Sequence, residues 1–235
     1  MRPCVIIPCF NHAATVLSVA AAASNYCPVV IVDDGSDSPL VAPKNCSLIR
    51  LHRNSGKGAA LTAGFKRAAA LGFTHAITMD ADGQHFVDDL PAFLARARER
   101  PNALVVGVRD FFAAQCPAAR RRSNWLSTIG FRVVTGLRLE DAQCGFRCYP
   151  VALTQRVKTR AGHYAFESEF MVRAVWIGAP LATVPVRCSY APFQLRQSHF
   201  RPVWDFSHIT LTKIGLALQS WTIPRARRAA WSAAG

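Results

Sequence analysis

The sequence lacks several features that would each indicate a class of protein. No stretch of 18 apolar residues is free of charge, so we predict no membrane-spanning helix. The eight cysteines include no Cys-x-x-Cys pair, which argues against a zinc site. Met1-Arg2-Pro3 runs directly into a strand-like segment, so we expect no signal peptide and reduced cysteines, most of them small core residues. With no internal repeat or long linker, 235 residues fit one domain with a small appendage.

Acidic residues are also scarce. The chain has 14 Asp and Glu against 28 Lys and Arg, a net charge of +14. Residues 1–113 carry 11 basic and 9 acidic side chains, whereas residues 114–235 carry 17 and 5. The basic surplus of the second half predicts an anionic partner, either a lipid phosphate or an anionic membrane surface. Nucleic acid is not expected as a partner, because no nucleic-acid-binding motif or basic–aromatic alternation is present.

The first hundred residues alternate between apolar strand patterns and helical patterns. This alternation predicts an α/β fold with a mostly parallel sheet and helices on both faces. Asn11 is a candidate cap for the first helix. The expected strands are residues 5–7, 29–32, 48–51, 76–79 and 104–108, and the expected helices are residues 13–23, 59–71 and 88–100.

The second half is less regular. Helices are expected at 122–135 and 167–177, and short strands at 145–149 and 181–187. Residues 204–223 are largely apolar but carry charged and polar side chains, with arginines and tryptophans nearby. This pattern is typical of an amphipathic helix at a membrane surface, and equally of a core helix in a soluble enzyme. We divide the chain into a domain of residues 1–200 and an amphipathic basic segment of residues 201–235.

Two carboxylates follow the apolar run that ends at Met79. Asp80-Ala81-Asp82 lies where a buried parallel strand would end, and ligands of such sheets bind beyond the carboxyl ends of the strands. Two adjacent carboxylates repel each other unless a cation lies between them, and oxygen ligands favour Mg²⁺ or Mn²⁺. The motif therefore predicts a metal–diphosphate site, with a surface turn as the alternative.

Two further loops follow predicted strands. Asp33-Asp34-Gly35-Ser36 could accept hydrogen bonds from a base or ribose, or could form an Asx turn. The loop at 54–58, Asn-Ser-Gly-Lys-Gly, precedes a helix and could hold an anion through backbone amides and Lys57. It is not a complete P-loop, so a capped turn is the alternative.

Basic and acidic residues of the second half supply candidates for an acceptor site. Arg109 and the run Arg120-Arg121-Arg122-Ser123 could hold a second phosphate, although charge runs are also common at solvated helix starts. Asp141 is a candidate general base. Glu167 and Glu169 lie among apolar residues. A glutamate in such a position has either a functional role or a structural role in an ion pair. The remaining candidates are His85, His163 and His199.

Taken in order, these motifs resemble the family 2 glycosyltransferases of the GT-A fold. The sequences that carry the resemblance are Ile-Pro-Cys-Phe-Asn at 7–11, Val-Asp-Asp-Gly-Ser at 32–36, the loop at 54–58, Asp-Ala-Asp-Gly-Gln-His at 80–85 and Gln-Cys-Gly-Phe-Arg at 143–147. The chain is most similar to the polyprenyl-phosphate branch, which includes the dolichyl-phosphate mannose synthases. The resemblance covers about residues 4–200.

The resemblance implies a donor site at the first four motifs. In the family, the motif at 7–11 packs on the base and the motif at 32–36 holds the base or ribose. The loop at 54–58 contacts the donor, and the motif at 80–85 binds a Mg²⁺ or Mn²⁺ ion. Asp82 matches the principal metal ligand, with Asp80 and Gln84 beside it. The matching nucleotide-sugar positions are Pro8, Phe10, Asn11, Asp33, Asp34, Lys57, Asp80 and Ala81.

The acceptor site implied by the resemblance lies in the second half. Arg109, Arg122 and Ser123 match positions that hold the acceptor phosphate, and Ser198-His199 matches a late Ser-Lys pair, with His in place of Lys. We expect an inverting transferase that uses a UDP- or GDP-sugar and acts at the cytoplasmic face of the inner membrane. Asp82, Asp141, Arg109 and Arg122 are its candidate catalytic residues, with Asp141 required only for a hydroxyl acceptor. A nucleotidyltransferase and a non-catalytic anion- or lipid-binding protein are the alternatives.

Overall fold

The computed structural model describes residues 1–112, 116–190 and 202–224, with the backbone alone for 202–209. The strands are β1 (Pro3–Cys9), β2 (Val29–Asp33), β3 (Cys46–Arg50), β4 (His75–Thr78), β5 (Leu104–Arg109), β6 (Arg147–Pro150) and β7 (Leu181–Val186). The helices are α1 (Ala13–Ala23), α2 (Lys57–Ala70), α3 (Leu90–Glu99), α4 (Ala118–Thr135), α5 (Val151–Arg156), α6 (Ala165–Trp176) and α7 (Pro202–Thr222). A 3-10 turn, η1 (Val87–Asp89), precedes α3. The expected α/β class is confirmed.

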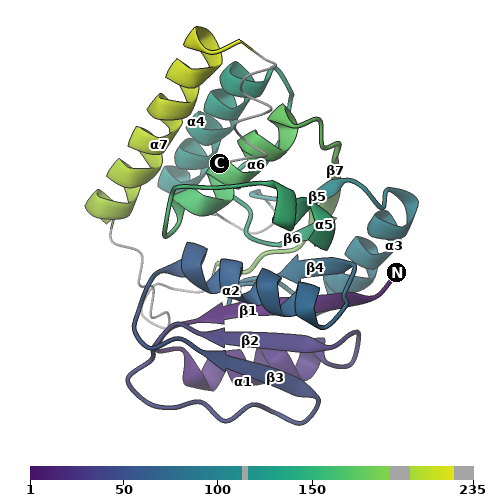
Figure 1. Ribbon diagram of the computed structural model, residues 1–235. Helices are drawn as coiled ribbons and strands as arrows, with labels where there is room; N and C mark the ends of the chain where they lie inside the picture. Colours follow the sequence, from purple (N-terminus) through teal and green to yellow (C-terminus); the bar gives the residue numbers. More distant parts are fainter. Residues whose placement is uncertain (113–115, 191–201, 225–235) are drawn as a thin grey trace.

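The strands form one sheet in the order β3-β2-β1-β4-β6-β5-β7 (Figure 1). β1 pairs in parallel with β2 and β4, and β5 pairs in parallel with β7. β6 lies between β4 and β5 and is antiparallel to both. Because β4 and β5 both oppose β6, they point the same way. The carboxyl ends of β1, β2, β4 and β5 therefore meet at one edge of the sheet.

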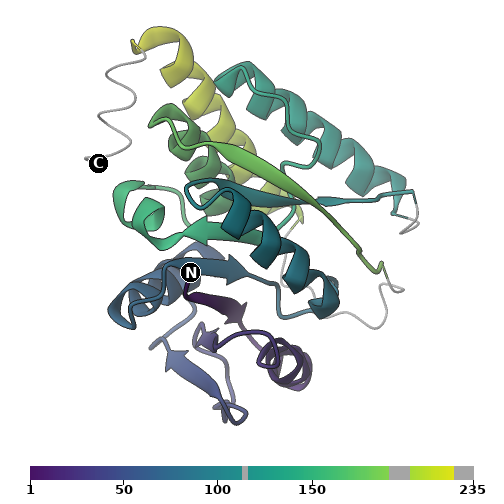
Figure 2. The same cartoon turned by 90° about the vertical axis from the view of Figure 1, so that its right-hand side faces the viewer.

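Helices cover both faces of the sheet (Figures 1 and 2). Alternate residues of β1 and β2 point to opposite sides, as expected for strands buried on both faces. Ile6 and Val32 pack with α2 and α6 on one side, whereas Val5 and Ile31 pack with α1 and α3 on the other. Two buried apolar clusters thus fix the sheet between two layers of helices.

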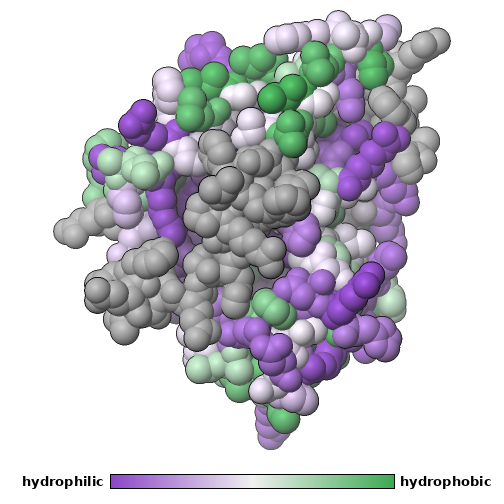
Figure 3. Space-filling model, turned by 90° about the vertical axis from the view of Figure 1, so that its left-hand side faces the viewer, coloured by the Kyte–Doolittle hydropathy of each residue, from purple (hydrophilic) through white to green (hydrophobic). Residues whose placement is uncertain are grey.

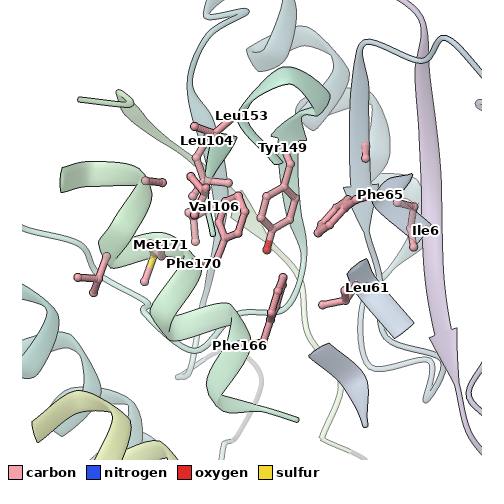
Figure 4. Packing of buried hydrophobic residues seen from close by; sticks show 14 of the residues in the cluster. Ile6, Leu61, Phe65, Leu104, Val106, Tyr149, Leu153, Phe166, Phe170 and Met171 are labelled. Carbon is pink, nitrogen blue, oxygen red and sulfur yellow. The ribbon is translucent and has the colours of Figure 1, made fainter. Parts of the chain in front are cut away.

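Aromatic rings fill the larger cluster (Figure 4). Phe65 of α2 lies 4.9 Å from the ring of Tyr149, measured between centroids, and Phe170 of α6 lies 5.2 Å from it at an interplanar angle of 79°. Edge-to-face and tilted pairs of this kind stabilise a core beyond the burial of their area. They join α2, β6 and α6, the three elements that carry Lys57, the 143–147 turn and Glu167.

The C-terminal helix α7 packs against α4 and α6 (Figure 1). Leu216 is only 2% exposed and belongs to the larger apolar cluster, so one side of α7 contributes to the core. The expected C-terminal helical segment is confirmed. Within the described residues, no helix is long and apolar enough to cross a membrane.

Two local expectations need correction. Asn11 does not cap α1: the cap position is His12, and Asn11 adopts a φ of 54° with its side chain bonded to Asp37. α4 begins at Ala118 rather than at residue 122, so the arginine run lies inside its first turns rather than before them. The eight cysteines form no disulfide and seven of them are buried, in agreement with their expected role as core thiols.

Candidate active site

The acidic loop after β4 lies at the shared edge of the sheet. The Asp80 side chain is 32% exposed, and Ala81 is buried beside it. The backbone amide of Gln84 donates to Asp82 Oδ1 at 3.0 Å, and its side-chain amide donates to Asp82 Oδ2. These bonds hold Asp82 and Gln84 together, so the structure brings the three expected metal-ligand candidates into one loop.

Lys57 joins this loop from α2, of which it is the first residue. Its Nζ lies 2.6 Å from Asp80 Oδ1 and 2.8 Å from Glu167 Oε2. Burial alone would lower the pKa of Lys57, but the charges of the two carboxylates raise it above its usual value. Burial likewise opposes ionisation of Asp80, yet Lys57 and other nearby cations hold the pKa of Asp80 below its usual value. Lys57 is therefore a paired cation, with two acids as partners.

Gly145 allows the 143–147 turn to reach this ion cluster. A β-carbon at Gly145 would lie 2.8 Å from Asp80 Oδ2 and 3.1 Å from Lys57 Nζ, so these two side-chain ends would have to shift. The fully buried Arg147 donates to the carbonyls of Cys144, Ala142 and Glu167 and so fixes the turn. The sequence motif at 143–147 is therefore part of the site, mainly through its backbone.

His85 closes the site on the side of β7. It is buried, its ring centroid lies 5.3 Å from that of Phe146, and it forms an isolated β-bridge with Cys188. Burial lowers the pKa of His85, although Asp80 and Asp82 oppose this effect. Its Nδ1 has no hydrogen-bond partner among the described residues.

Asp33, the last residue of β2, and Asp34, which follows it, are both buried and both accept hydrogen bonds. Asp33 accepts from the Ser36 amide at 2.9 Å and from the Arg50 guanidinium at 3.0 Å. Asp34 accepts from the amides of Ser55 and Gly56, at 2.9 and 2.7 Å. Burial raises the pKa of Asp34, against the lowering effect of these two amide bonds. Asp34 thus orients the loop that leads into Lys57, and Asp33 holds the turn at Ser36.

The base-side candidates lie at the end of β1. Pro8, Phe10 and Asn11 are each half-buried. The side-chain oxygen Oδ1 of Asn11 accepts from the backbone amide of Asp37 at 2.9 Å, and the backbone amide of Asn11 donates to Ser36 Oγ. This bonding ties the loop after β1 to the loop after β2, so the two predicted base-binding segments form one wall of the site.

Arg109 and Asp141 form a bidentate ion pair. Arg109 Nε donates to Asp141 Oδ2 at 2.6 Å, and its terminal nitrogen donates to Oδ1 at 2.9 Å. Asp141 is fully buried, and it also accepts from the amide of Gln143. The charge of Asp141 raises the pKa of Arg109 above its usual value despite burial. The structure therefore makes Asp141 a partner of Arg109, with both of its oxygens occupied.

A cavity of about 370 Å³ lies beside this pair. The Phe111 ring, which lines it, lies 5.0 Å from the Arg109 guanidinium carbon. Arg122, which is exposed, also lines the cavity, and Ser123 Oγ accepts from the Gln143 side chain at 3.1 Å. The other lining residues are Phe112, Arg121, Asn124, Trp125, Thr128 and Glu140. Ser198 and His199, the last two acceptor candidates, lie outside the described residues.

The acidic cluster fits a hard divalent cation. Asp80 and Glu167 share Lys57, and Asp82 follows Asp80 in the same loop, so these four side chains sum to a formal charge of −2. Arg109 and His85 also act on Asp80 through their charge. The acids do not form a group of three or more His, Cys, Asp or Glu ligands around one point in the part of the chain that the structure describes. This is compatible with Mg²⁺-type sites, in which one or two carboxylates act together with substrate phosphates.

The sequence leaves the role of Glu167 open and does not pair Asp141 with Arg109. Glu167 is 110 positions from Lys57 in the chain, and Asp141 is 32 positions from Arg109. No local pattern links residues so far apart. For Glu167, the sequence showed only an acidic residue among apolar ones, which left a functional or a structural role open.

The sequence matches a known protein family. The model of "Glycosyl transferase family 2" matches residues 4–160. An undecaprenyl-phosphate mannosyltransferase of Micrococcus luteus is 27% identical, over 97% of this chain and 99% of its own. A UDP-N-acetylglucosamine–dolichyl-phosphate N-acetylglucosaminyltransferase of Methanococcus voltae is also 27% identical, over 81% of this chain and 87% of its own.

Solved structures agree on the fold. Glucosyl-3-phosphoglycerate synthase from Mycobacterium tuberculosis, in complex with Mn²⁺, UDP and phosphoglyceric acid, superposes with a TM-score of 0.69. The similarity covers 95% of this chain and 79% of that chain at 16% identity, so it shows the fold alone. Together with the family match, it confirms the expected GT-A architecture. The chain therefore belongs to glycosyl transferase family 2 and is a glycosyltransferase, with relatives in the polyprenyl-phosphate branch of that family.

Proposed function

We propose that the protein transfers a sugar, with inversion, from a nucleotide-diphospho-sugar to a polyprenyl-phosphate or related lipid-linked acceptor. The observation that carries the proposal is the juxtaposition of two sites at one sheet edge. The acidic loop after β4 contacts the 143–147 turn, and the same turn contacts Arg109 through Asp141. A donor diphosphate and an acceptor phosphate can thus be held on either side of one turn.

The donor would lie against the acidic loop with Mg²⁺ or Mn²⁺. Asp82 and Gln84, with Asp80 beside them, would hold the ion. When bound, the ion supplies positive charge that stabilises the leaving nucleoside diphosphate. Asp34 orients the Gly56–Lys57 loop, and the loops after β1 and β2 would contact the base and ribose. The glucosyl-3-phosphoglycerate synthase complexes with UDP and Mn²⁺ or Mg²⁺ support the same class of donor.

The acceptor would lie in the cavity lined by aromatic and basic side chains. Phe111 and Trp125 offer apolar contacts for a lipid chain, while Arg122 offers a charged contact for its phosphate. Arg109 reaches the boundary between this cavity and the acidic loop. The named activities of the mannosyltransferase and N-acetylglucosaminyltransferase relatives support a polyprenyl or dolichyl phosphate as the acceptor class.

The bonding of Asp141 favours a phosphate acceptor over a hydroxyl acceptor. A phosphate is already ionised and requires no general base, and catalysis then depends mainly on positioning and charge stabilisation. Asp141 has both oxygens committed to Arg109 and Gln143, so it is better placed to orient Arg109 than to accept a proton. Direct attack of the phosphate on the anomeric carbon inverts its configuration.

An anionic membrane surface is the proposed location of the reaction, on the cytoplasmic face. Figure 3 shows apolar side chains gathered on the upper part of the face that α7 occupies. α4 carries four arginines and no acidic residue. Both helices lie side by side and expose large apolar residues: Trp125, Leu126, Ile129 and Val133 on α4, and Leu211, Ile214, Leu218 and Trp221 on α7. Such a surface combines apolar insertion with attraction to anionic lipid.

The direct test is product analysis with purified protein, Mn²⁺, labelled UDP- or GDP-sugars and a short-chain polyprenyl phosphate. We expect a glycosyl phospholipid with inverted anomeric configuration and release of nucleoside diphosphate. Transfer of the nucleoside monophosphate to the acceptor, with release of a sugar 1-phosphate, would instead indicate nucleotidyl transfer. Equal turnover with a polyprenol that lacks the phosphate would contradict the proposed acceptor class, and absence of metal-dependent donor turnover would contradict the donor site.

A further inference from the structure

Glu167 of α6 has an unusual place in the ion cluster. Its residue exposure is 7%, and its Oε2 lies 2.8 Å from Lys57 Nζ, whose side chain is 12% exposed. Lys57 also bonds Asp80 at 2.6 Å. One buried ammonium is thus shared by a carboxylate of the acidic loop and by a carboxylate that belongs to a different element.

The surroundings leave this arrangement little freedom. Gly145 packs against the ends of the Asp80 and Lys57 side chains so closely that a methyl group would require them to shift. Gly56, the residue before Lys57, has a φ of 89° and packs against the His163 ring, where a β-carbon would lie 2.2 Å from Nδ1. The position of the Lys57 side chain, between two acids, is therefore constrained by close packing on both sides.

We infer that Glu167 is a positioning residue of the donor site, which tunes the affinity of the acidic loop for its divalent cation by sharing Lys57 with Asp80. The inference rests on the proposed function, because it assumes that Asp82 and Asp80 serve a metal-bound donor. Glu167 lies in a helix outside the motifs that carried the family resemblance, so the loop sequence alone does not assign it this role.

Glu167 acts on the acidic loop through its charge. With Glu167 ionised, the cluster of Lys57, Asp80, Asp82 and Glu167 has a formal charge of −2. Without that carboxylate, Lys57 would pair with Asp80 alone, and the formal charge of the cluster would fall to −1. Asp80 would then be the only acid paired with Lys57, and the electrostatic potential at the metal would be less negative. Because the group is partly shielded from water, the loss of one unit charge is expected to have a large effect.

A purely structural role is the competing explanation, and the same helix offers a matched control. Glu169 is 3% exposed and is also paired: its Oε1 lies 2.6 Å from Arg173 Nε, and its Oε2 accepts from the amides of Arg160 and Ala161. None of these partners belongs to the acidic loop. Replacing Glu169 removes a buried carboxylate from α6 without changing the charge beside Asp80.

The experiment is a Mn²⁺ titration followed by electron paramagnetic resonance, in the presence of saturating UDP or GDP, whichever the wild-type protein binds. We expect Glu167→Gln to weaken Mn²⁺ binding by about tenfold, the size expected for one unit charge in a partly buried site. Glu169→Gln should leave the Mn²⁺ affinity within about twofold, although it lowers the melting temperature. Equal Mn²⁺ affinity for Glu167→Gln and the wild type would overturn the inference.

A double variant keeps the test decisive if Glu167→Gln does not fold. Lys57→Met/Glu167→Gln removes both buried charges and leaves the two acids of the loop, so the formal charge returns to −2. We expect its Mn²⁺ affinity to lie within about threefold of the wild type, because the lost positive charge of Lys57 and the lost negative charge of Glu167 compensate each other within one cluster. A tenfold loss in the double variant would overturn the inference. If the wild-type protein itself binds no Mn²⁺ with either nucleotide, it is the proposed function that fails.

Discussion

At the scale of single residues, the site consists mainly of side chains that are already paired. Lys57 lies between two acids, Asp141 holds Arg109, and Asp34 holds a loop. Such preorganised charges stabilise a developing charge without rearranging when the reaction occurs. The sequence predicts which residues take part, because the motifs place them after strands. It does not predict the pairs, because the partners come from separate elements and meet only in the folded chain.

The Arg109–Asp141 pair gives a prediction that separates positioning from proton transfer. Asp141→Asn leaves a buried guanidinium with a weaker partner and should cost about 3–5 kcal/mol of stability, as breaking buried ion pairs does. We expect a higher KM for the polyprenyl-phosphate acceptor and an unchanged shape of the kcat–pH profile, measured by steady-state kinetics. Asp110→Asn, at an exposed acid next to Arg109, is the control. Loss of one limb of the kcat–pH profile in Asp141→Asn would show that Asp141 acts as a base.

At the scale of elements, local patterns define most of the fold. α1 has the predicted bounds, and the predicted strands at 29–32 and 104–108 differ from β2 and β5 by a single residue at one end. The antiparallel direction of β6 was not predicted, because the sequence of a short strand does not indicate its direction. α5 was not predicted either; it begins directly after Pro150, the last residue of β6. The start of α4 was missed since its first turn, Ala118 onward, has no capping side chain.

The contact between α4 and α7 contains a half-buried lysine, Lys213, which has a measurable consequence. Lys213 Nζ donates to Ser127 Oγ at 2.7 Å, and no acidic partner lies within ion-pair distance among the described residues. Burial lowers the pKa of Lys213 to about 8. The folded protein then binds fewer protons than the unfolded chain between about pH 8 and the ordinary lysine pKa near 10.4, so this group makes stability rise with pH across that window.

We therefore expect Lys213→Met to raise the melting temperature at pH 7, where the buried charge is costly, and to have little effect near pH 10. Thermal unfolding between pH 7 and 10 measures both values. Lys44→Met, at a lysine in a loop far from α7 in sequence, serves as the control for removing a positive charge. An equal loss of stability in Lys213→Met at both pH values would contradict a desolvated ammonium at this contact.

At the scale of the whole molecule, charge and apolar surface are distributed unequally. The second half carries the basic excess, and the exposed apolar residues of α4 and α7 lie in that half. The composition predicted an anionic partner, but it did not predict that α4 would share this surface with α7. That adjacency follows from packing: Leu216 and Lys213 direct one side of α7 inward, and Leu218 and Trp221 remain outside.

The membrane proposal predicts a loss of binding on removal of two apolar side chains. Leu218→Ser/Trp221→Ser should reduce flotation with anionic vesicles by at least about tenfold, because each inserted side chain contributes about 1.5–3 kcal/mol. Wild-type binding should weaken with added salt, because exposed charges are screened. Val41→Ser, at an 83% exposed apolar residue in the first half, should not change flotation. Flotation that is unaffected by both the double variant and salt would contradict the proposed surface.

The proposed reaction depends on acidic side chains at the sheet edge that bind a donor diphosphate together with a divalent cation. The most direct test is the melting temperature of wild-type protein and Asp82→Asn with UDP or GDP, in Mn²⁺ or in EDTA, because a ligand that binds only the folded state raises it. We predict a rise for the wild type in Mn²⁺ and little or none in EDTA or in Asp82→Asn. An equal rise in EDTA, or in Asp82→Asn with Mn²⁺, would contradict the account.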